Sequence, residues 1–165
     1  MKKEVFLLLG SDMGDRLSNL SQARDFICAA VGALLEQSPI YETEAWGFAS
    51  EALFLNQVLR VESDLSAFDL LELLKQIELR MGRLPSLLEG YVSRAIDIDI
   101  LFYGNELIDS EHLTIPHSKL HERRFALLPM VDIASDMYHP LLKKSLIQLL
   151  NECQDTLNVR LFVEK

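Results

Sequence analysis

The sequence predicts an α+β fold in which an antiparallel sheet carries helices on one face and is followed by a C-terminal extension. Apolar runs of strand length alternate with segments whose apolar residues recur at helical spacing. The chain has 165 residues, which is enough for one domain with a buried core. Its residues are 49% hydrophobic and 25% charged, as in an ordinary globular protein, so a single domain over residues 1–165 is expected.

The expected elements follow one another as strand, helix, strand, strand, helix and strand. The second helix has the clearest boundaries, because Ser66 can cap its start and Gly82 can end it. This order is that of the ferredoxin-like βαββαβ arrangement. Short helices over 125–133 and 146–150 and a last strand over 159–163 form the extension. The six elements of the core are expected over residues 4–9, 17–34, 36–46, 53–62, 66–82 and 96–102.

The strongest chemical signal is a pair of acids, Asp97 and Asp99, inside the last of these strands. Because side chains alternate along a strand, both carboxylates should lie on one face, roughly 6–7 Å apart, with Ile96, Ile98 and Ile100 on the other face in a core. Mg²⁺ accepts one or two carboxylates and keeps positions for phosphate oxygens. A solvated strand face explains the spacing equally well. Arg94, just before the pair, favours the metal and phosphate interpretation.

The charge distribution excludes some classes of partner. A net charge of −9 argues against nucleic acid, whose binding requires a basic surface. Residues 112–124 are nevertheless rich in histidine, lysine and arginine, which suits a cleft for a small polyanion. No apolar run has membrane-spanning length and no signal sequence is evident, so a cytoplasmic protein without membrane partners is expected. Cys28 and Cys153 are expected to be buried free thiols.

Two further features remain ambiguous from the residues alone. Asn56 lies within a predicted strand, where asparagine is disfavoured. The simpler interpretation is a satisfied core amide or a β-bulge, and the alternative is a group that recognises the edge of a heterocycle. The aperiodic segment that follows Arg83 leads directly into the acid strand, and a loop of this length is often functional.

Together these residues resemble the 6-hydroxymethyl-7,8-dihydropterin pyrophosphokinase family of folate biosynthesis. The strongest part is Arg94-Ala95-Ile96-Asp97-Ile98-Asp99, which is similar to the family signature Arg-x-x-Asp-x-Asp before an apolar run. The resemblance extends from Gly10 to about Pro140. Supporting matches are Gly10-Ser11, Tyr41-Glu42-Thr43, Phe54-Leu55-Asn56, Ile77-Glu78, Gly82-Arg83, Leu113-Thr114-Ile115-Pro116-His117, Arg123 and Phe125.

The resemblance implies transfer of pyrophosphate from ATP to the pterin hydroxymethyl oxygen, with release of AMP and with two Mg²⁺ ions held by Asp97 and Asp99. ATP and the pterin would be the partners of a monomer. The implied catalytic residues are Arg83, Arg94, Asp97 and Asp99. The implied ATP-binding residues are Glu78, Arg94, Ile100, Leu113, Thr114, His117 and Arg123. The implied pterin-binding residues are Thr43, Trp46, Phe54, Asn56, Tyr91 and Phe125.

Several positions depart from the family pattern. Tyr91-Val92-Ser93 stands where Trp-Gly-Pro is usual, and His112 replaces a frequent arginine. Two alternatives therefore stay open. One is a non-catalytic nucleotide- or pterin-binding regulatory module of the same fold. The other is a related phosphotransferase with a different acceptor, which Glu44 and Trp46 would permit.

Overall fold

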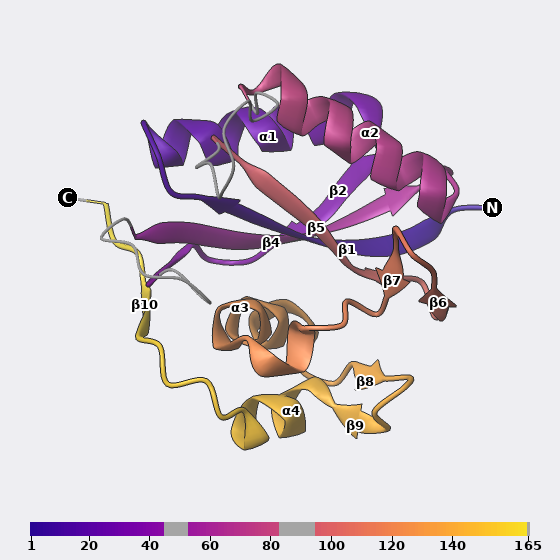
Figure 1. Cartoon of the computed structure of the whole chain (residues 1–165), viewed down its shortest axis with the longest axis vertical. Coiled ribbons are helices and arrows are strands. Elements are labelled where there is room, and N and C mark those ends of the chain that lie inside the picture. Colours follow the sequence, from indigo (N-terminus) through magenta and orange to yellow (C-terminus); the bar gives the residue numbers. More distant parts are fainter. Residues whose placement is uncertain (45–52, 83–94, 165) are drawn as a thin grey trace.

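A six-stranded sheet forms the centre of the fold (Figure 1). The computed structural model describes residues 1–44, 53–82 and 95–164. The strands lie in the order β10-β3-β4-β1-β5, with β2 also paired to β4, and every pairing is antiparallel. The predicted α+β class is therefore confirmed. The strands are β1 (Lys3–Ser11), β2 (Ala33–Gln37), β3 (Tyr41–Thr43), β4 (Phe54–Ser63), β5 (Asp97–Tyr103) and β10 (Val159–Leu161).

The single extended segment expected over 36–46 is two strands, β2 and β3, which pair with successive parts of β4. They are separated at Ser38, whose hydroxyl accepts a hydrogen bond from the Val58 amide at 2.9 Å. Pro39 follows and has no amide hydrogen to contribute to the ladder. The Ser38 amide still donates to the Val58 carbonyl oxygen at 2.9 Å, so its side chain takes the place of the backbone acceptor only.

Helices α1 (Arg16–Ala30) and α2 (Ala67–Arg80) cover one face of the sheet (Figure 1). Ser66 caps α2 as predicted, accepting from the Asp69 amide at 3.2 Å. Helix α1 ends earlier than predicted, because Gly32 packs against β4. A Cβ at Gly32 would lie 1.9 Å from the Glu62 carbonyl oxygen, so only glycine allows the chain to pass this close to β4 just after the helix ends at Ala30. Isoleucines 96, 98 and 100 enter the core under these helices, as their alternation predicts.

The opposite face is covered too, by the part of the chain that follows β5 (Figure 1). Helices α3 (Arg124–Ala134) and α4 (Leu146–Glu152) pack there with the short 3-10 helix η1 (Leu120–Glu122). The expectation of helices on one face is therefore wrong for the whole chain. The physical reason is a second apolar core, which contains Phe6, Leu8, Val58, Leu101 and Phe102 from the sheet and Ala126, Leu127, Met130, Leu146 and Leu149 from the helices.

Two small hairpins complete the described structure: β6 (Ile108–Asp109) with β7 (Thr114–Ile115), and β8 (Tyr138–His139) with β9 (Lys144–Ser145). Both cysteines are free, but neither is fully buried as predicted: Cys28 is exposed on the outer side of α1, and Cys153 is only partly buried. Within the described residues, no helix combines the length and apolar character needed to cross a bilayer.

Candidate functional site

The acid pair lies at the start of β5, where this strand runs antiparallel to β1. Asp97 stands opposite Gly10 and Asp99 opposite Leu8. The end of β1 also holds the chain just before β5, since the Ser11 hydroxyl donates to the Ala95 carbonyl oxygen at 2.6 Å. Both carboxylates line one pocket on the face of α3, whereas the isoleucines that alternate with them enter the opposite core. The pair thus shares a face, as the two-residue period predicts.

We call the cavity beside this pair the first pocket. It combines an aromatic wall with polar groups, which is typical of a site for a planar, hydrogen-bonding ligand. Strand β1 supplies its floor, β3 and β4 one side, and the start of α3 another. Its lining residues are Leu8, Gly10, Thr43, Glu44, Phe54, Asn56, Asp97, Asp99, Arg123 and Phe125.

Asn56 is the most informative residue of the first pocket. It is only 2% exposed, yet within the described residues its Nδ2 atom has no hydrogen-bond partner. A satisfied core amide, the simpler interpretation of the sequence, is therefore not what this part of the chain contains. Gly10 leaves room for the amide, since a Cβ at Gly10 would lie 3.2 Å from Asn56 Oδ1. A buried donor left unpaired is costly, and a ligand in the pocket would satisfy it.

Two basic side chains face Asp99 from beyond the strand. Arg123 Nη1 lies 3.9 Å and His117 Nε2 lies 4.0 Å from the same oxygen, Asp99 Oδ2. The Arg123 guanidinium also lies over the Phe125 ring, 5.7 Å from its centroid. At these distances the carboxylate is attracted to both groups but is bound tightly by neither, so an anionic ligand could share them.

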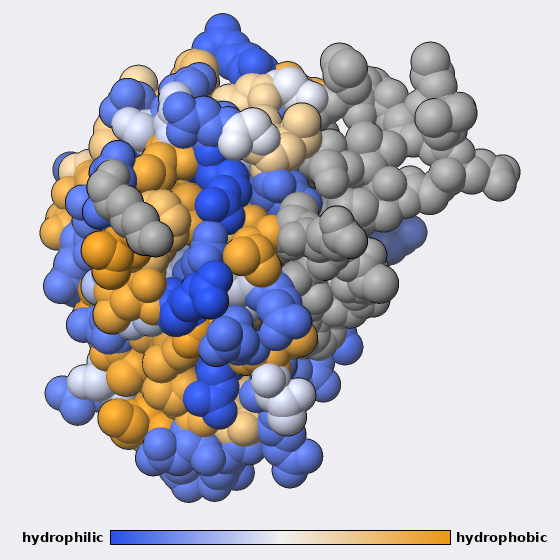
Figure 2. Space-filling model, turned by 90° about the vertical axis from the view of Figure 1, so that its left-hand side faces the viewer, coloured by the Kyte–Doolittle hydropathy of each residue, from blue (hydrophilic) through white to orange (hydrophobic). Residues whose placement is uncertain are grey.

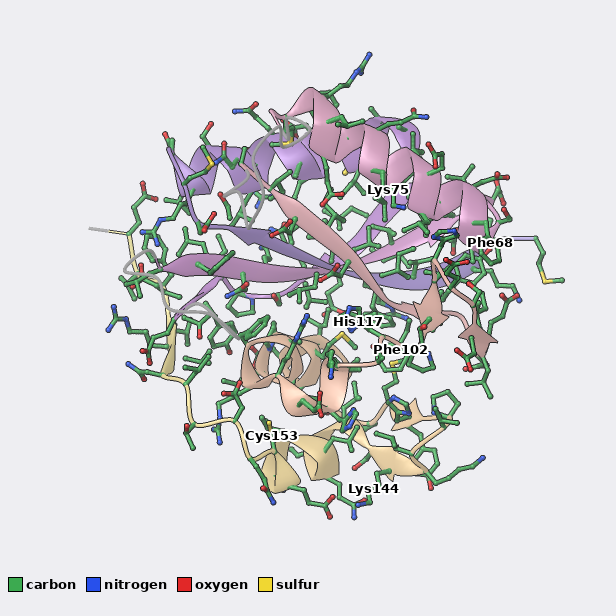
Figure 3. All side chains as sticks on the ribbon, in the orientation of Figure 1. Phe68, Lys75, Phe102, His117, Lys144 and Cys153 are labelled. Atoms are coloured by element: carbon green, nitrogen blue, oxygen red, sulfur yellow. The ribbon has the colours of Figure 1, made fainter. Side chains whose placement is uncertain are left out.

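The protonation of His117 follows from its surroundings (Figure 3 shows it between the sheet and α3). Burial lowers its pKa, and this effect outweighs the opposing charge of Asp99. The imidazole is therefore neutral at neutral pH. Its Nδ1 accepts from the Lys119 amide at 3.1 Å, so Nε2 carries the proton and faces Asp99. Burial also lowers the pKa of Arg123, but an arginine keeps its charge at neutral pH.

A second pocket lies on the other side of Asp99, between β5 and the segment that contains β7. Asp99 is the residue that the two pockets have in common among those the structure describes. Ligands in the two pockets would therefore meet at this carboxylate. The lining residues of the second pocket are Leu71, Ile98, Asp99, Ile100, Glu111, His112, Leu113, Thr114, His117 and Ser118.

Most predicted site residues fall into these two pockets. The first pocket contains Thr43, Phe54, Asn56, Asp97, Asp99, Arg123 and Phe125. The second contains Ile100, Leu113, Thr114 and His117. Glu78 is the described exception: it is buried on α2, and its Oε2 accepts from the Ile98 amide at 3.1 Å, behind the acid strand. Trp46, Arg83, Tyr91 and Arg94 lie outside the described residues.

Among the described lining residues of the first pocket, three were not predicted: Leu8, Gly10 and Glu44. The strand expected over residues 4–9 extends through Gly10 to Ser11, so Gly10 lies within β1 and pairs with both Asn56 and Asp97. A glycine at the end of an apolar strand was the available signal, because such a position allows a close approach from a neighbouring side chain.

An antiparallel sheet that presents paired carboxylates and basic side chains where two pockets meet is typical of proteins that bind small anionic ligands. Comparison with known proteins gives the particular family. The family model described as 7,8-dihydro-6-hydroxymethylpterin-pyrophosphokinase (HPPK) matches residues 6–135, so this chain belongs to the HPPK family.

Relatives support this assignment. The chain is 42% identical over 132 residues to 2-amino-4-hydroxy-6-hydroxymethyldihydropteridine pyrophosphokinase of Porphyromonas gingivalis, covering 79% of this chain and 90% of the relative. The Bacillus subtilis protein of the same name is 36% identical over 138 residues, covering 83% and 81%. The "Folic acid synthesis protein fol1" of Schizosaccharomyces pombe is 36% identical over 151 residues, but these are 91% of this chain and only 20% of that protein.

A solved structure supports the fold. The HPPK-DHPS triple mutant of Plasmodium falciparum matches 92% of this chain with a TM-score of 0.77, at 16% sequence identity. This chain covers 43% of that longer one. At this identity the match concerns the arrangement of elements alone.

Proposed function

We propose that this chain is an HPPK enzyme, which transfers the terminal pyrophosphate of ATP to the hydroxymethyl group of 6-hydroxymethyl-7,8-dihydropterin and releases AMP. The family model and the names of the relatives from P. gingivalis and B. subtilis support the assignment. The observation that carries it furthest is that two pockets of different character share Asp99, which would bring an acceptor and a phosphate donor together.

The first pocket suits the pterin. Phe54 and Phe125 are proposed to contact the faces of the ring, and the unpaired Asn56 amide to bind its amide-like edge. The Thr43 hydroxyl already donates to the Asn158 carbonyl oxygen at 3.1 Å, so the backbone of Thr43 would meet the ligand. Trp46 and Tyr91 are assigned to the same ligand by the resemblance alone.

The second pocket suits the nucleotide. Ile100, Leu113 and Thr114 would contact ATP, while His117 and Arg123 face the meeting point of the pockets and would bind its phosphates. Arg83 and Arg94 are proposed to neutralise charge that develops during transfer. The resemblance also assigns Glu78 to the nucleotide, although its carboxylate supports the Ile98 amide, so a contact with ATP remains a prediction.

The residues present fit Mg²⁺. Asp97 and Asp99 offer hard carboxylate oxygens on one face of β5, directly on the first pocket. In the described ranges, no group of three or more histidine, cysteine, aspartate or glutamate side chains is arranged so that it could hold a metal ion by itself. Mg²⁺ suits such a site, because it binds through one or two carboxylates and completes its shell with substrate phosphates and water. When bound, the two ions would neutralise phosphate charge.

The reaction would follow from positioning. The pterin hydroxymethyl oxygen attacks the β-phosphorus, the bond from that phosphorus to the oxygen bridging to the α-phosphorus breaks, AMP leaves, and the hydroxyl proton passes to solvent. Arg123 and the neutral His117 hold phosphate oxygens beside Asp99. Holding both reactants side by side makes the reaction effectively unimolecular, which is a main source of rate enhancement in phosphoryl transfer.

The topology supports one structural proposal. The β1-α1-β2/β3-β4-α2-β5 part is assigned to the ferredoxin-like βαββαβ arrangement, because its strand order is that of the fold once β2 and β3 are taken as one interrupted strand. The whole of residues 1–165 is proposed to act as one domain and as a monomer.

The test is incubation of the purified chain with ATP, Mg²⁺ and the reduced pterin, with AMP and the pterin diphosphate measured by chromatography. Both products should appear together, and neither should form without the pterin or with Asp97→Asn. Pterin binding without AMP would instead support the regulatory module. AMP formation only with another hydroxyl acceptor would support the related phosphotransferase.

A further inference from the structure

The C-terminal segment returns to the wall of the first pocket. Strand β10 lies at the edge of the sheet (Figure 1) and pairs with β3, so that Arg160 is opposite Glu42 and Val159 is opposite Thr43. Two more contacts continue this pairing: the Thr43 hydroxyl donates to the Asn158 carbonyl oxygen at 3.1 Å, and the Asn158 amide donates to Glu44 Oε1 at 3.2 Å. Thr43 and Glu44 both line the first pocket, so the end of the chain holds that wall from behind.

Figure 2 views the side of the molecule on which β10 lies and shows hydrophilic residues in a band between apolar areas. One carboxylate on this side joins several elements. Arg16 Nη1 donates to Glu42 Oε2 at 3.0 Å, and Arg160 Nη2 donates to Glu42 Oε1 at 2.7 Å. The Glu42 side chain is only 12% exposed, and its hydrogen bonds to arginine lower its pKa, so the carboxylate stays charged.

Arg16 extends the network to the strand on the other side of β3. The same Nη1 atom donates to the Leu53 carbonyl oxygen at 2.8 Å. Leu53 immediately precedes Phe54, and Phe54 is paired with Thr43. The network therefore fixes the residues directly before Thr43 and Phe54, two neighbouring residues of the pocket wall.

We propose that Glu42, held by Arg16 and Arg160, is a positioning residue for the pterin. It fixes β3 and the start of β4 relative to each other, so that Thr43, Phe54 and Asn56 are arranged before the ligand binds. The proposal rests on the proposed function for the identity of the ligand. If the pocket wall is ordered before the pterin binds, less conformational entropy is lost on binding. Loss of the Glu42 contacts should therefore weaken binding of the pterin and not of ATP, whose pocket lies beyond Asp99.

A matched control lies in the same sheet. Arg60 on β4 binds Glu4 on β1, with Nη2 to Oε1 at 2.7 Å, the same distance as in the Arg160 and Glu42 pair. Arg60 and Glu4 line neither the first nor the second pocket. Arg60→Ala therefore removes a comparable cross-strand ion pair without touching the proposed pterin wall.

The experiment compares Glu42→Gln, Arg160→Ala and Arg160→Lys with Arg60→Ala. It measures the KM for each substrate, the pterin Kd by calorimetry, and amide hydrogen exchange of residues 41–43 and 54–56. Glu42→Gln and Arg160→Ala should raise the pterin KM and Kd about three- to tenfold, leave the ATP KM within about twofold, and speed exchange in both segments. Arg160→Lys should restore part of the loss, and Arg60→Ala should change neither KM.

Other outcomes would overturn the proposal. Equal changes in both KM values would indicate a general structural role, as would the same pattern in Arg60→Ala. An unchanged exchange rate at residues 54–56 in Glu42→Gln would refute the positioning itself, and this readout needs no activity. Absence of AMP formation by the unmodified chain would count against the proposed function alone, because hydrogen exchange still decides whether Glu42 orders the wall.

Discussion

Replacing Asn56 with alanine should separate binding from stability. The amide is 2% exposed and its Nδ2 has no partner within the described residues, so the ligand-free protein carries the cost of a buried, unpaired donor. Such a group costs about 1–3 kcal/mol. Truncation removes that cost and enlarges the open pocket rather than creating a closed cavity. We therefore expect the free energy of unfolding without ligand to fall by less than about 1 kcal/mol, or to rise.

Pterin binding, unlike the stability of the ligand-free protein, should be clearly weakened. In Asn56→Ala the amide-like edge of the pterin would lose its partner and remain desolvated in the pocket. Loss of about 1–3 kcal/mol corresponds to a Kd weakened about 5- to 150-fold. Calorimetric titration with the pterin measures the affinity, and urea denaturation without ligand measures the stability.

Gln57 provides the control. It is a buried amide on β4, as Asn56 is, but its side chain lies on the α1 side of the sheet and not in the first pocket. Its Nε2 donates to the Ser38 carbonyl oxygen at 2.8 Å, and its Oε1 accepts from Arg24 at 2.7 Å. Gln57→Ala should lower the free energy of unfolding by about 1–3 kcal/mol, while pterin affinity stays within about twofold. The reasoning is refuted if Asn56→Ala destabilises as strongly as Gln57→Ala, or if the two variants bind the pterin equally well.

Three further predictions follow from the site. Asp99→Asn should slow AMP release at least about 100-fold at saturating Mg²⁺, because the shared carboxylate is neutralised; a rate within tenfold of the unmodified protein would contradict this. Gly10→Ala should weaken pterin binding at least about threefold, because the new Cβ would lie 3.2 Å from Asn56 Oδ1 and displace the amide. An unchanged pterin Kd by calorimetry would contradict this. The pKa of Glu42 is lowered from 4.5, mainly by its hydrogen bond to Arg160, so the stabilisation from its charge is complete above that value and is lost as the pH falls through the lower folded pKa. Denaturation between about pH 3 and pH 7 should accordingly show the stability gap between the protein and Glu42→Gln shrinking only below about pH 4.5.

Local periodicity was enough to predict the arrangement of the acid strand. Asp97 and Asp99 share a face because side chains alternate, and this holds whatever the strand pairs with. The second layer of helices was missed, although a signal was present. Residues 5–9 are all apolar, and a strand that is apolar on both sides is buried on both faces. The C-terminal helices were therefore required to cover the second face.

The roles of Gly10, Glu44 and Glu78 depend on long-range pairing, which no local pattern reveals. Gly10 enters the pocket only because β1 lies between β4 and β5. Glu44 is held there by the Asn158 amide, more than a hundred residues further along the chain. Glu78 has the sequence context of an exposed helical residue, but it is 5% exposed and accepts from the Ile98 amide.

The position of β5 explains both why Glu78 is buried and why Asp99 lines both pockets. Among the described strands, β5 pairs only with β1 and so forms an edge of the sheet, where outward amides need other partners. Glu78 satisfies one of them, at Ile98, between the two acids. In a central strand the next strand would fill the space beside Asp99. At an edge, the same carboxylate can face one pocket on the sheet surface and another beyond the strand, and this is why two ligands can meet there.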